Sequence, residues 1–164
     1  MNSNLKSFFK DNKINYILHK HPAVFTVEES SKIIKGIPGL RTKSLFLKDE
    51  DSRFYLITLP GQKRLNIKFL KFYFKIKELN FASPEELKNK LNTTPGSVSP
   101  LAILNSQSVQ FILDQEVWNA DIVQCHPDIN TETLEIASQD FKKFYNILPG
   151  KKSVIEIPAE EQNG

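Results

Sequence analysis

The sequence predicts a single α+β domain built around a mixed β-sheet. Its 164 residues fit one domain and are enough to bury a core. A hydrophobic fraction of 40% that includes twelve phenylalanines indicates a folded globule rather than a disordered chain. Helical and strand patterns are interspersed, but hairpins outnumber clean β-helix-β units, which favours an α+β fold over a doubly wound one. We expect one domain over residues 1–164, with a frayed tail at 160–164.

Residue spacing and capping residues predict the helices. Leu5, Phe8 and Phe9 follow i, i+3, i+4 spacing and indicate a short amphipathic first helix. Two later segments, Thr26–Glu29 and Ser83–Glu86, are capping boxes, in which the first side chain accepts a backbone N–H while a glutamate reaches back. Further helices are therefore expected at 27–35, from 84 to about 91, and around 141–148 with Ser138 as the N-cap.

Apolar segments between polar turns predict the strands. An extended segment at 16–19 follows the first helix. Residues 45–48 and 54–59 flank the polar turn 49–52, which is typical of a β-hairpin. More strands are expected at 109–113, 121–125 and 131–136.

Composition limits where the protein acts and what it binds. Cys125 is the single cysteine, which excludes an intramolecular disulfide and fits a reducing compartment, so we expect a cytoplasmic protein. The N-terminus lacks the continuous apolar segment of a secretion signal, and no apolar run approaches the roughly 20 residues that span a bilayer. We expect no membrane contact. The net charge of +3 allows an anionic partner without demanding one.

Lys43 is the first candidate for a functional site because of its position in an expected strand. If 43–48 is extended, Lys43 shares one face with Leu45 and Leu47, while Ser44 begins the alternate face. With the leucine row toward the core, the Lys43 ammonium would lie at the rim of a pocket, where it could hold a phosphate or a developing oxyanion. The commoner alternative is a strand-end lysine that extends to solvent.

The segment from Gly96 to Pro100 is the second candidate. Glycine lets the backbone approach a ligand closely, proline fixes the exit, and the intervening amides can point at a carbonyl oxygen. An ordinary turn is the commoner meaning of such a string.

His126 is the third candidate, because it ends an expected strand and precedes Pro127, which places its ring near a sheet edge. A lone histidine is more often a hydrogen-bonded structural residue. His19 and His21, two residues apart, would form half a metal site, but no third ligand completes it. We therefore expect a reaction that needs no metal.

The sequence gives no support for a covalent or cofactor-dependent mechanism. A Gly-x-Ser-x-Gly string is absent, and the side chains of Cys125 and His126 would alternate to opposite faces of a strand. There is also no phosphate-binding Gly-x-x-x-x-Gly-Lys loop and no dinucleotide fingerprint. We expect no cofactor.

A basic stripe is predicted after the hairpin. Its members recur at spacings of four, three and four, which places them on one side of a helix; they are Arg64, Lys68, Lys71 and Lys75. The expected opposite, apolar side comprises Leu65, Phe69, Phe72, Tyr73 and Ile76. The stripe could follow a phosphate backbone or could be a solvated lysine face, and the sequence favours neither.

Four segments keep a characteristic order and spacing over nearly the whole chain. They are 21–29, 41–49, 96–100 and 125–131. Together they resemble the free-standing prolyl-tRNA editing domains of the YbaK/ProX family of aminoacyl-tRNA deacylases. The resemblance implies a mixed, partly closed sheet flanked by helices.

The resemblance also implies roles for individual residues. Lys43 falls on the position of the family's catalytic lysine, Gly96 begins its Gly-x-x-x-Pro loop, and His126 lines its aminoacyl pocket, so these are the expected catalytic residues. Whether His126 acts sterically, as an orienting group or as a general base stays open. The expected substrate-binding residues are His21, Thr26, Ser44, Ser97, Val98, Ser99, Pro100, Asn130 and Thr131.

The implied function is hydrolysis of the ester between a wrong amino acid and tRNA(Pro), in trans. The segments at 21–29 and 81–87 resemble alanyl-tRNA(Pro) deacylases most, and the cysteinyl branch is the nearest rival. Many alanyl editors have Asn after the lysine, where this chain has Ser44, so the amino-acid preference is less determined than deacylation. Expected partners are the acceptor end of tRNA(Pro) and, as a candidate, prolyl-tRNA synthetase. The alternative is a non-catalytic module that binds tRNA or a synthetase.

Overall fold

The computed structural model describes residues 1–23, 26, 28, 32 and 35–160. The helix predicted at 27–35 falls mainly outside these residues, as does the tail after Glu160, so both stay predictions. In chain order the elements are α1 (Ser3–Asp11), β1 (Ile17–Lys20), β2 (Leu40–Asp49), β3 (Phe54–Pro60), α3 (Ile67–Phe74), β4 (Leu79–Phe81), α4 (Pro84–Leu91), the 3-10 helix η1 (Pro100–Asn105), β5 (Gln110–Asp114), α5 (Gln115–Asn119), β6 (Ile122–Cys125), β7 (Glu132–Ala137), α6 (Ser138–Ile147) and β8 (Lys152–Ile155).

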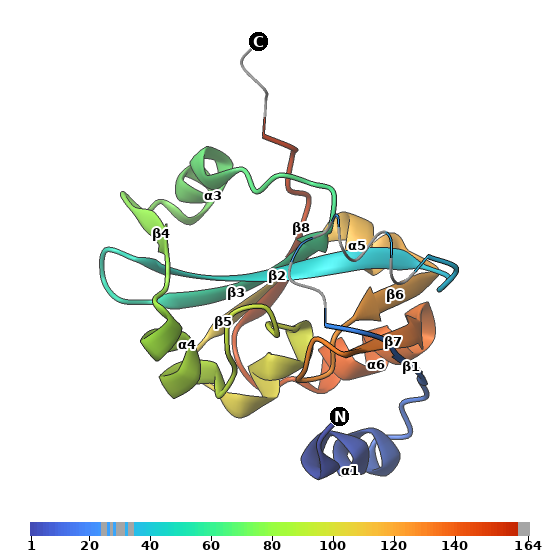
Figure 1. Cartoon of the computed structure of the whole chain (residues 1–164). Coiled ribbons are helices and arrows are strands. Elements are labelled where there is room, and N and C mark those ends of the chain that lie inside the picture. The colour runs from blue at the N-terminus through green and yellow to red at the C-terminus, as the bar shows by residue number, and fades with distance from the viewer. Residues whose placement is uncertain (24–25, 27, 29–31, 33–34, 161–164) are drawn as a thin grey trace.

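The predicted α+β architecture is confirmed. An eight-stranded sheet has the order β1-β7-β6-β2-β3-β5-β8, and β4 pairs with β2 beside this path. The sheet is mixed: β2 pairs antiparallel with β3 and β4 but parallel with β6. In Figure 1, α3 lies above the sheet while α4, α6 and α1 lie below it. None of the helices in the described part of the chain has the length and apolar character needed to cross a bilayer.

Helices α1 and α4 begin at side-chain N-caps. Asn2 accepts the Leu5 N–H at 2.9 Å and begins α1. At α4 both bonds of the predicted capping box are present, with the Glu86 N–H donating to Ser83 Oγ and the Ser83 N–H donating to Glu86 Oε1.

One predicted cap is wrong. Ala137 is the N-cap of α6, and no side chain caps this helix. Since β7 ends at Ala137 and α6 begins at the next residue, Ser138 lies inside the first turn and its N–H donates to the carbonyl of Asp121 at 2.8 Å. The short elements β4, η1, α5 and β8 were not predicted either, because each is too short to show a hydrophobic period.

Two hydrophobic cores lie on opposite faces of the sheet. The larger includes buried residues of α1, α4, η1 and α6, and the smaller lies under α3. The side chains of successive β2 residues pack in different cores, with Phe46 in the larger core and Leu47 in the smaller. The predicted alternation of this strand is therefore confirmed.

The sheet has a gap along the edge of β2 that faces away from β3. On that edge β2 pairs with β6 only at Leu40 and Arg41, and with β4 only at 47–49. Among the described residues, no strand pairs with this edge between those two segments. This gap positions the candidate site.

Candidate functional site

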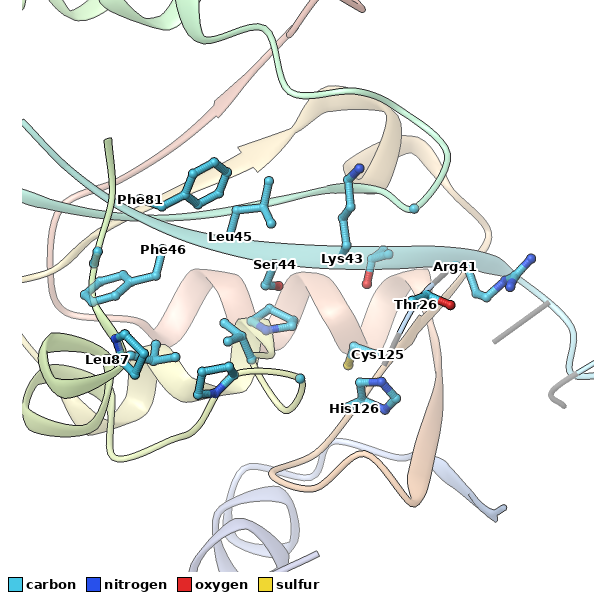
Figure 2. Close-up of a pocket in the computed structure, with 18 residues that line it drawn as sticks. Thr26, Arg41, Lys43, Ser44, Leu45, Phe46, Phe81, Leu87, Cys125 and His126 are labelled. Atoms are coloured by element: carbon cyan, nitrogen blue, oxygen red, sulfur yellow. The ribbon is translucent and has the colours of Figure 1, made fainter. Parts of the chain in front are cut away.

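A cavity of about 390 Å³ occupies the gap between β4 and β6. Consecutive residues of β2 form one wall, and the others come from β4 and α4, from the loop before η1, and from the end of β6 (Figure 2). Its lining residues are Thr26, Arg41, Thr42, Lys43, Ser44, Leu45, Phe46, Gly61, Phe81, Ala82, Pro84, Leu87, Pro95, Gly96, Val98, Pro100, Cys125 and His126.

Lys43 borders the cavity from one side of β2. Its side chain points to the same side as Leu45, whereas Ser44 and His126 lie on the other side of the strand (Figure 2). Burial lowers the pKa of the Lys43 ammonium. Among the described residues, the Lys43 ammonium has no hydrogen-bond or ion-pair partner. The site thus contains a partly desolvated cation that is free to bind an anionic group or an oxyanion.

The Ser44 hydroxyl is already engaged. Ser44 is 8% exposed, and its Oγ lies 2.8 Å from Thr58 Oγ1 on β3. The expected contribution of Ser44 to substrate binding must therefore come from its main chain or from a rearranged side chain.

The loop that begins at Gly96 faces the cavity only in part. Gly96 has a φ of +87°, a left-handed conformation that favours glycine. It lines the cavity together with Val98 and Pro100. Ser97 and Ser99 are not among the lining residues.

Internal bonds explain why two of the loop's serines do not reach the cavity. The Ser97 N–H donates to the carbonyl of Thr94 at 3.1 Å. Ser99 is 1% exposed, and its Oγ accepts the Leu101 N–H at 3.0 Å, which caps η1. The N–H groups of Gly96 and Val98, which both line the cavity, have no partner among the described residues, so both are candidates to donate to a ligand.

His126 lines the cavity on the other side of β2 from Lys43, and its hydrogen bond fixes its tautomer. Its Nδ1 lies 2.8 Å from the carbonyl oxygen of Glu132, which can only accept, so Nδ1 carries the proton and Nε2 is an acceptor in the neutral ring. Burial lowers the pKa of His126 more than this bond raises it, and the nearby His21 lowers it further. The ring is therefore neutral at pH 7.

His21 lies behind His126 rather than in the cavity wall. The two ring centroids are 6.2 Å apart. His21 Nδ1 donates to the carbonyl of Pro22 at 2.8 Å, and Nε2 lies 2.7 Å from Thr133 Oγ1. His21 thus positions its neighbours, whereas Thr26 lines the cavity as expected.

Asn130 and Thr131 lie in the loop between β6 and β7 and are not among the lining residues. The carbonyl of Thr131 accepts the His21 N–H at 2.9 Å. The structure brings Thr131 to His21, and neither Asn130 nor Thr131 lines the cavity.

Neither Cys125 nor the histidines form a second reactive centre. Burial raises the pKa of Cys125 to about 12, so its thiol stays protonated at neutral pH. His19 Nε2 lies 3.0 Å from Glu135 Oε1 across the β1–β7 pair. Within the described residues, no three His, Cys, Asp or Glu side chains gather as a metal site would require.

The basic stripe is shorter than predicted. Only Lys68 and Lys71 lie within α3, while Lys75 is its left-handed C-cap. Arg64 precedes the helix, and its Nε donates to Glu160 Oε2 at 3.0 Å.

The predicted apolar side of the stripe is wrong at two aromatic residues. Phe72 is 83% exposed and Tyr73 is 47% exposed, and α3 is anchored through the buried Leu70. Phe72 lies one helical turn after the exposed Lys68, so it falls on the solvent side of α3, opposite the face that buries Leu70.

Several lining residues were missed by sequence reasoning, and five of them come from the segment between α3 and η1. Phe81 belongs to the three-residue β4, which has no sequence signal of its own. Pro84 and Leu87 belong to α4, whose capping box located the helix without indicating what it faces.

Comparisons with known proteins agree on one kind of domain. A family model for the aminoacyl-tRNA editing domain matches residues 21–144. The prolyl-tRNA editing protein ProX of Acetoanaerobium sticklandii is 33% identical over 149 residues, which cover 88% of this chain and 90% of that protein. The prolyl-tRNA synthetase associated domain-containing protein 1 of Danio rerio is 33% identical over 144 residues, covering 85% of this chain and 78% of the relative. A solved structure described as a candidate trans-editing enzyme for prolyl-tRNA synthetase superposes with a TM-score of 0.74 at 16% identity, covering 98% of this chain and 99% of the other.

Proposed function

Because the chain belongs to the aminoacyl-tRNA editing domain family, we propose that it hydrolyses the ester of mischarged aminoacyl-tRNA(Pro) in trans, with alanyl-tRNA(Pro) as its main substrate. The strongest support is a single cavity bordered by the Lys43 ammonium, the Gly96 loop and the neutral ring of His126. The name of the ProX relative, a prolyl-tRNA editing protein, supports the choice of tRNA.

The reaction requires positioning more than activation, since an aminoacyl ester is already reactive. Water adds to the ester carbonyl, the carbonyl oxygen becomes an oxyanion, and the ester C–O bond then breaks as the ribose oxygen takes a proton. Lys43 and the Val98 N–H are the proposed donors to the oxyanion. His126 Nε2 is the proposed acceptor that orients the attacking water or the neighbouring ribose hydroxyl.

Selectivity is proposed to depend on size. Pro84, Pro95 and Pro100 form inflexible parts of the cavity wall, and Leu87 adds a branched side chain. A synthetase discriminates poorly against smaller amino acids, because a missing methylene is worth only about 1 to 3 kcal/mol, whereas a second and smaller site can exclude the correct one. Proline would then be rejected sterically while alanine enters.

Lys68, Lys71 and Lys75 are proposed to contact tRNA phosphates. Lys68 and Lys75 are exposed, and no acidic partner occupies any of the three among the described residues. Arg64 contributes only if its bond to Glu160 opens. The name of the Danio rerio relative makes prolyl-tRNA synthetase a candidate partner, and action in translation would place the protein in the cytoplasm.

Two alternatives are distinguished by one assay. The first alternative is a preference for cysteinyl-tRNA(Pro) in the same cavity. The second is a binding module of this fold that does not turn over. Release of amino acid is measured from tRNA(Pro) charged with Ala, Cys, Ser or Pro. Rapid release from Ala-tRNA(Pro) alone supports the proposal, fastest release from Cys-tRNA(Pro) supports the cysteinyl alternative, and tight binding without any release supports the module.

A further inference from the structure

The gap in the sheet leaves the backbone N–H and C=O of Ser44, on β2, without a partner among the described residues. The direction of each peptide group follows from the β2–β3 ladder. The carbonyl of Arg41 accepts the Gly61 N–H at 2.8 Å, and the Asp49 N–H donates to the carbonyl of Arg53 at 3.0 Å. The backbone N–H and C=O groups of odd-numbered β2 residues therefore point toward β3. The carbonyl of Phe46 instead accepts the Ala82 N–H at 2.9 Å, so the backbone N–H and C=O groups of even-numbered β2 residues point away from β3.

Ser44 lies midway along this open edge. By the alternation of an antiparallel pair, its N–H and its C=O both face the gap. Neither group has a hydrogen-bond partner among the described residues, although Ser44 is 8% exposed. Buried backbone groups are almost always paired, so an unpaired N–H and C=O in a cavity wall indicate a ligand that pairs with them.

The backbone of Ser44 is also held in place. Its neighbours Lys43 and Leu45 pair with Leu59 and Ile57 of β3, and its hydroxyl is fixed by Thr58. The Ser44 N–H and C=O are thus fixed in the positions that would pair with one residue of an added strand.

We propose that the main chain of Ser44 binds the α-amino acid portion of the substrate as a one-residue strand addition. The α-ammonium of the substrate donates to the Ser44 C=O, and the ester carbonyl accepts the Ser44 N–H, as in a hydrogen-bonded antiparallel pair. This pairing recognises any α-aminoacyl group independently of its side chain, so the cavity walls alone select by size. The inference rests on the proposed deacylase function, for which it identifies how the aminoacyl group is held.

The same pairing places the reacting carbon between the two faces of the strand. Lys43 lies on one side of β2 and His126 on the other, so a carbonyl aligned with the strand edge has the ammonium on one side and the imidazole on the other (Figure 2). The Ser44 N–H then becomes a further donor to the oxyanion.

A backbone substitution tests the role of the N–H. In vitro translation with a suppressor tRNA can insert lactic acid at position 44, and Ser44→Ala is the matched control because the two differ only by O in place of N–H. We expect the lactic acid variant to hydrolyse Ala-tRNA(Pro) about 10- to 100-fold more slowly than Ser44→Ala, because only the N–H differs between them. Equal rates for the two variants, with equal melting temperatures, would overturn the proposal.

A binding measurement separates this inference from the deacylase function. A non-hydrolysable amide analogue, 3′-alanylamino-3′-deoxyadenosine, is titrated into protein labelled with ¹⁵N-serine. We expect the Ser44 amide resonance to shift and its hydrogen exchange to slow, even if the protein proves to be a binding module. An unchanged Ser44 amide while other site resonances respond would refute the strand addition and leave deacylation intact. Wild-type protein that releases no amino acid would instead refute the proposed function.

Discussion

His126 is in the state that an acceptor requires. Burial lowers its pKa, and the Glu132 carbonyl fixes the proton on Nδ1. We expect ¹⁵N NMR to show a neutral ring with an unprotonated Nε2 at pH 7 and a pKa below 6.5. Because the folded pKa is depressed, protonation of His126 also destabilises the fold, starting as the pH falls through the unfolded value of about 6.5. A proton on Nε2, or a pKa above 6.5, would exclude the proposed acceptor role.

Gly96 allows the loop to reach the cavity because of its left-handed backbone. We expect Gly96→Val to lower deacylation of alanyl and cysteinyl substrates alike, since a branched side chain would enter the space of the ester. Strain at positive φ also costs about 1 to 2 kcal/mol of stability. Gly36→Val is the matched control, because Gly36 has a φ of +100° and open space around it. If the control loses as much activity as Gly96→Val at equal stability, strain alone explains the effect.

The β2–β3 hairpin, which supports Lys43, is stabilised by its turn. Asp49 is 5% exposed and accepts hydrogen bonds from Tyr55 Oη at 2.7 Å and Arg53 Nε at 2.8 Å, besides the turn amides. We expect Asp49→Ala to lower the free energy of unfolding in urea by about 2 to 4 kcal/mol, because these donors lose their acceptor. Asp51→Ala, at a side chain that is 67% exposed, is the control and should change stability by less than about 0.5 kcal/mol.

The same carboxylate gives the hairpin a pH dependence. Burial alone would raise the pKa of Asp49, but hydrogen bonds from Arg53, Tyr55 and Asp51 lower it overall. Since the folded pKa is depressed, its contribution to stability is present above the unfolded value of about 4 and is lost as the pH falls through the folded value. Asp49→Asn should therefore weaken the acid-dependent loss of stability, and an unchanged pH profile would contradict this assignment.

Helix α3 offers a test of tRNA contact. We expect Lys68→Ala with Lys71→Ala to weaken the affinity for tRNA(Pro) and to reduce the slope of log K against log salt by roughly 0.7 to 0.9 for each lost phosphate contact. The matched control is Lys6→Ala with Lys10→Ala, two exposed lysines of α1. Equal slopes for the wild type and the α3 variant would make this face a solvated surface.

At the scale of the whole molecule, local patterns predicted the longer elements but neither the short ones nor the gap in the sheet. The period of two in Lys43, Leu45 and Leu47 is a local property and is confirmed by the two cores. The gap depends on β2 pairing with β6 at one end and with β4 at the other, and these long-range contacts leave no periodic signal. The exposure of Phe72 was not predicted for the same reason, because it depends on how α3 packs on the sheet.

The site was predictable only as separate segments. Lys43, Gly96, Val98, Pro100 and His126 do border one cavity, although they are far apart in the sequence. The packing of α4 and η1 against the larger core is what brings them together, and only tertiary structure specifies it.

The most direct test of the account is single-turnover deacylation of Ala-tRNA(Pro) by the wild type and by Lys43→Ala. Lys43 has no partner among the described residues, so the variant should fold with an unchanged melting temperature while its rate falls by about two orders of magnitude or more. Lys48→Ala, on the same strand but paired with Glu86 at 2.7 Å, is the control and should retain activity. The account predicts rapid release of alanine by the wild type, little release of proline from Pro-tRNA(Pro), and loss of activity in Lys43→Ala but not in Lys48→Ala. A folded Lys43→Ala variant that hydrolyses Ala-tRNA(Pro) at the wild-type rate would contradict it.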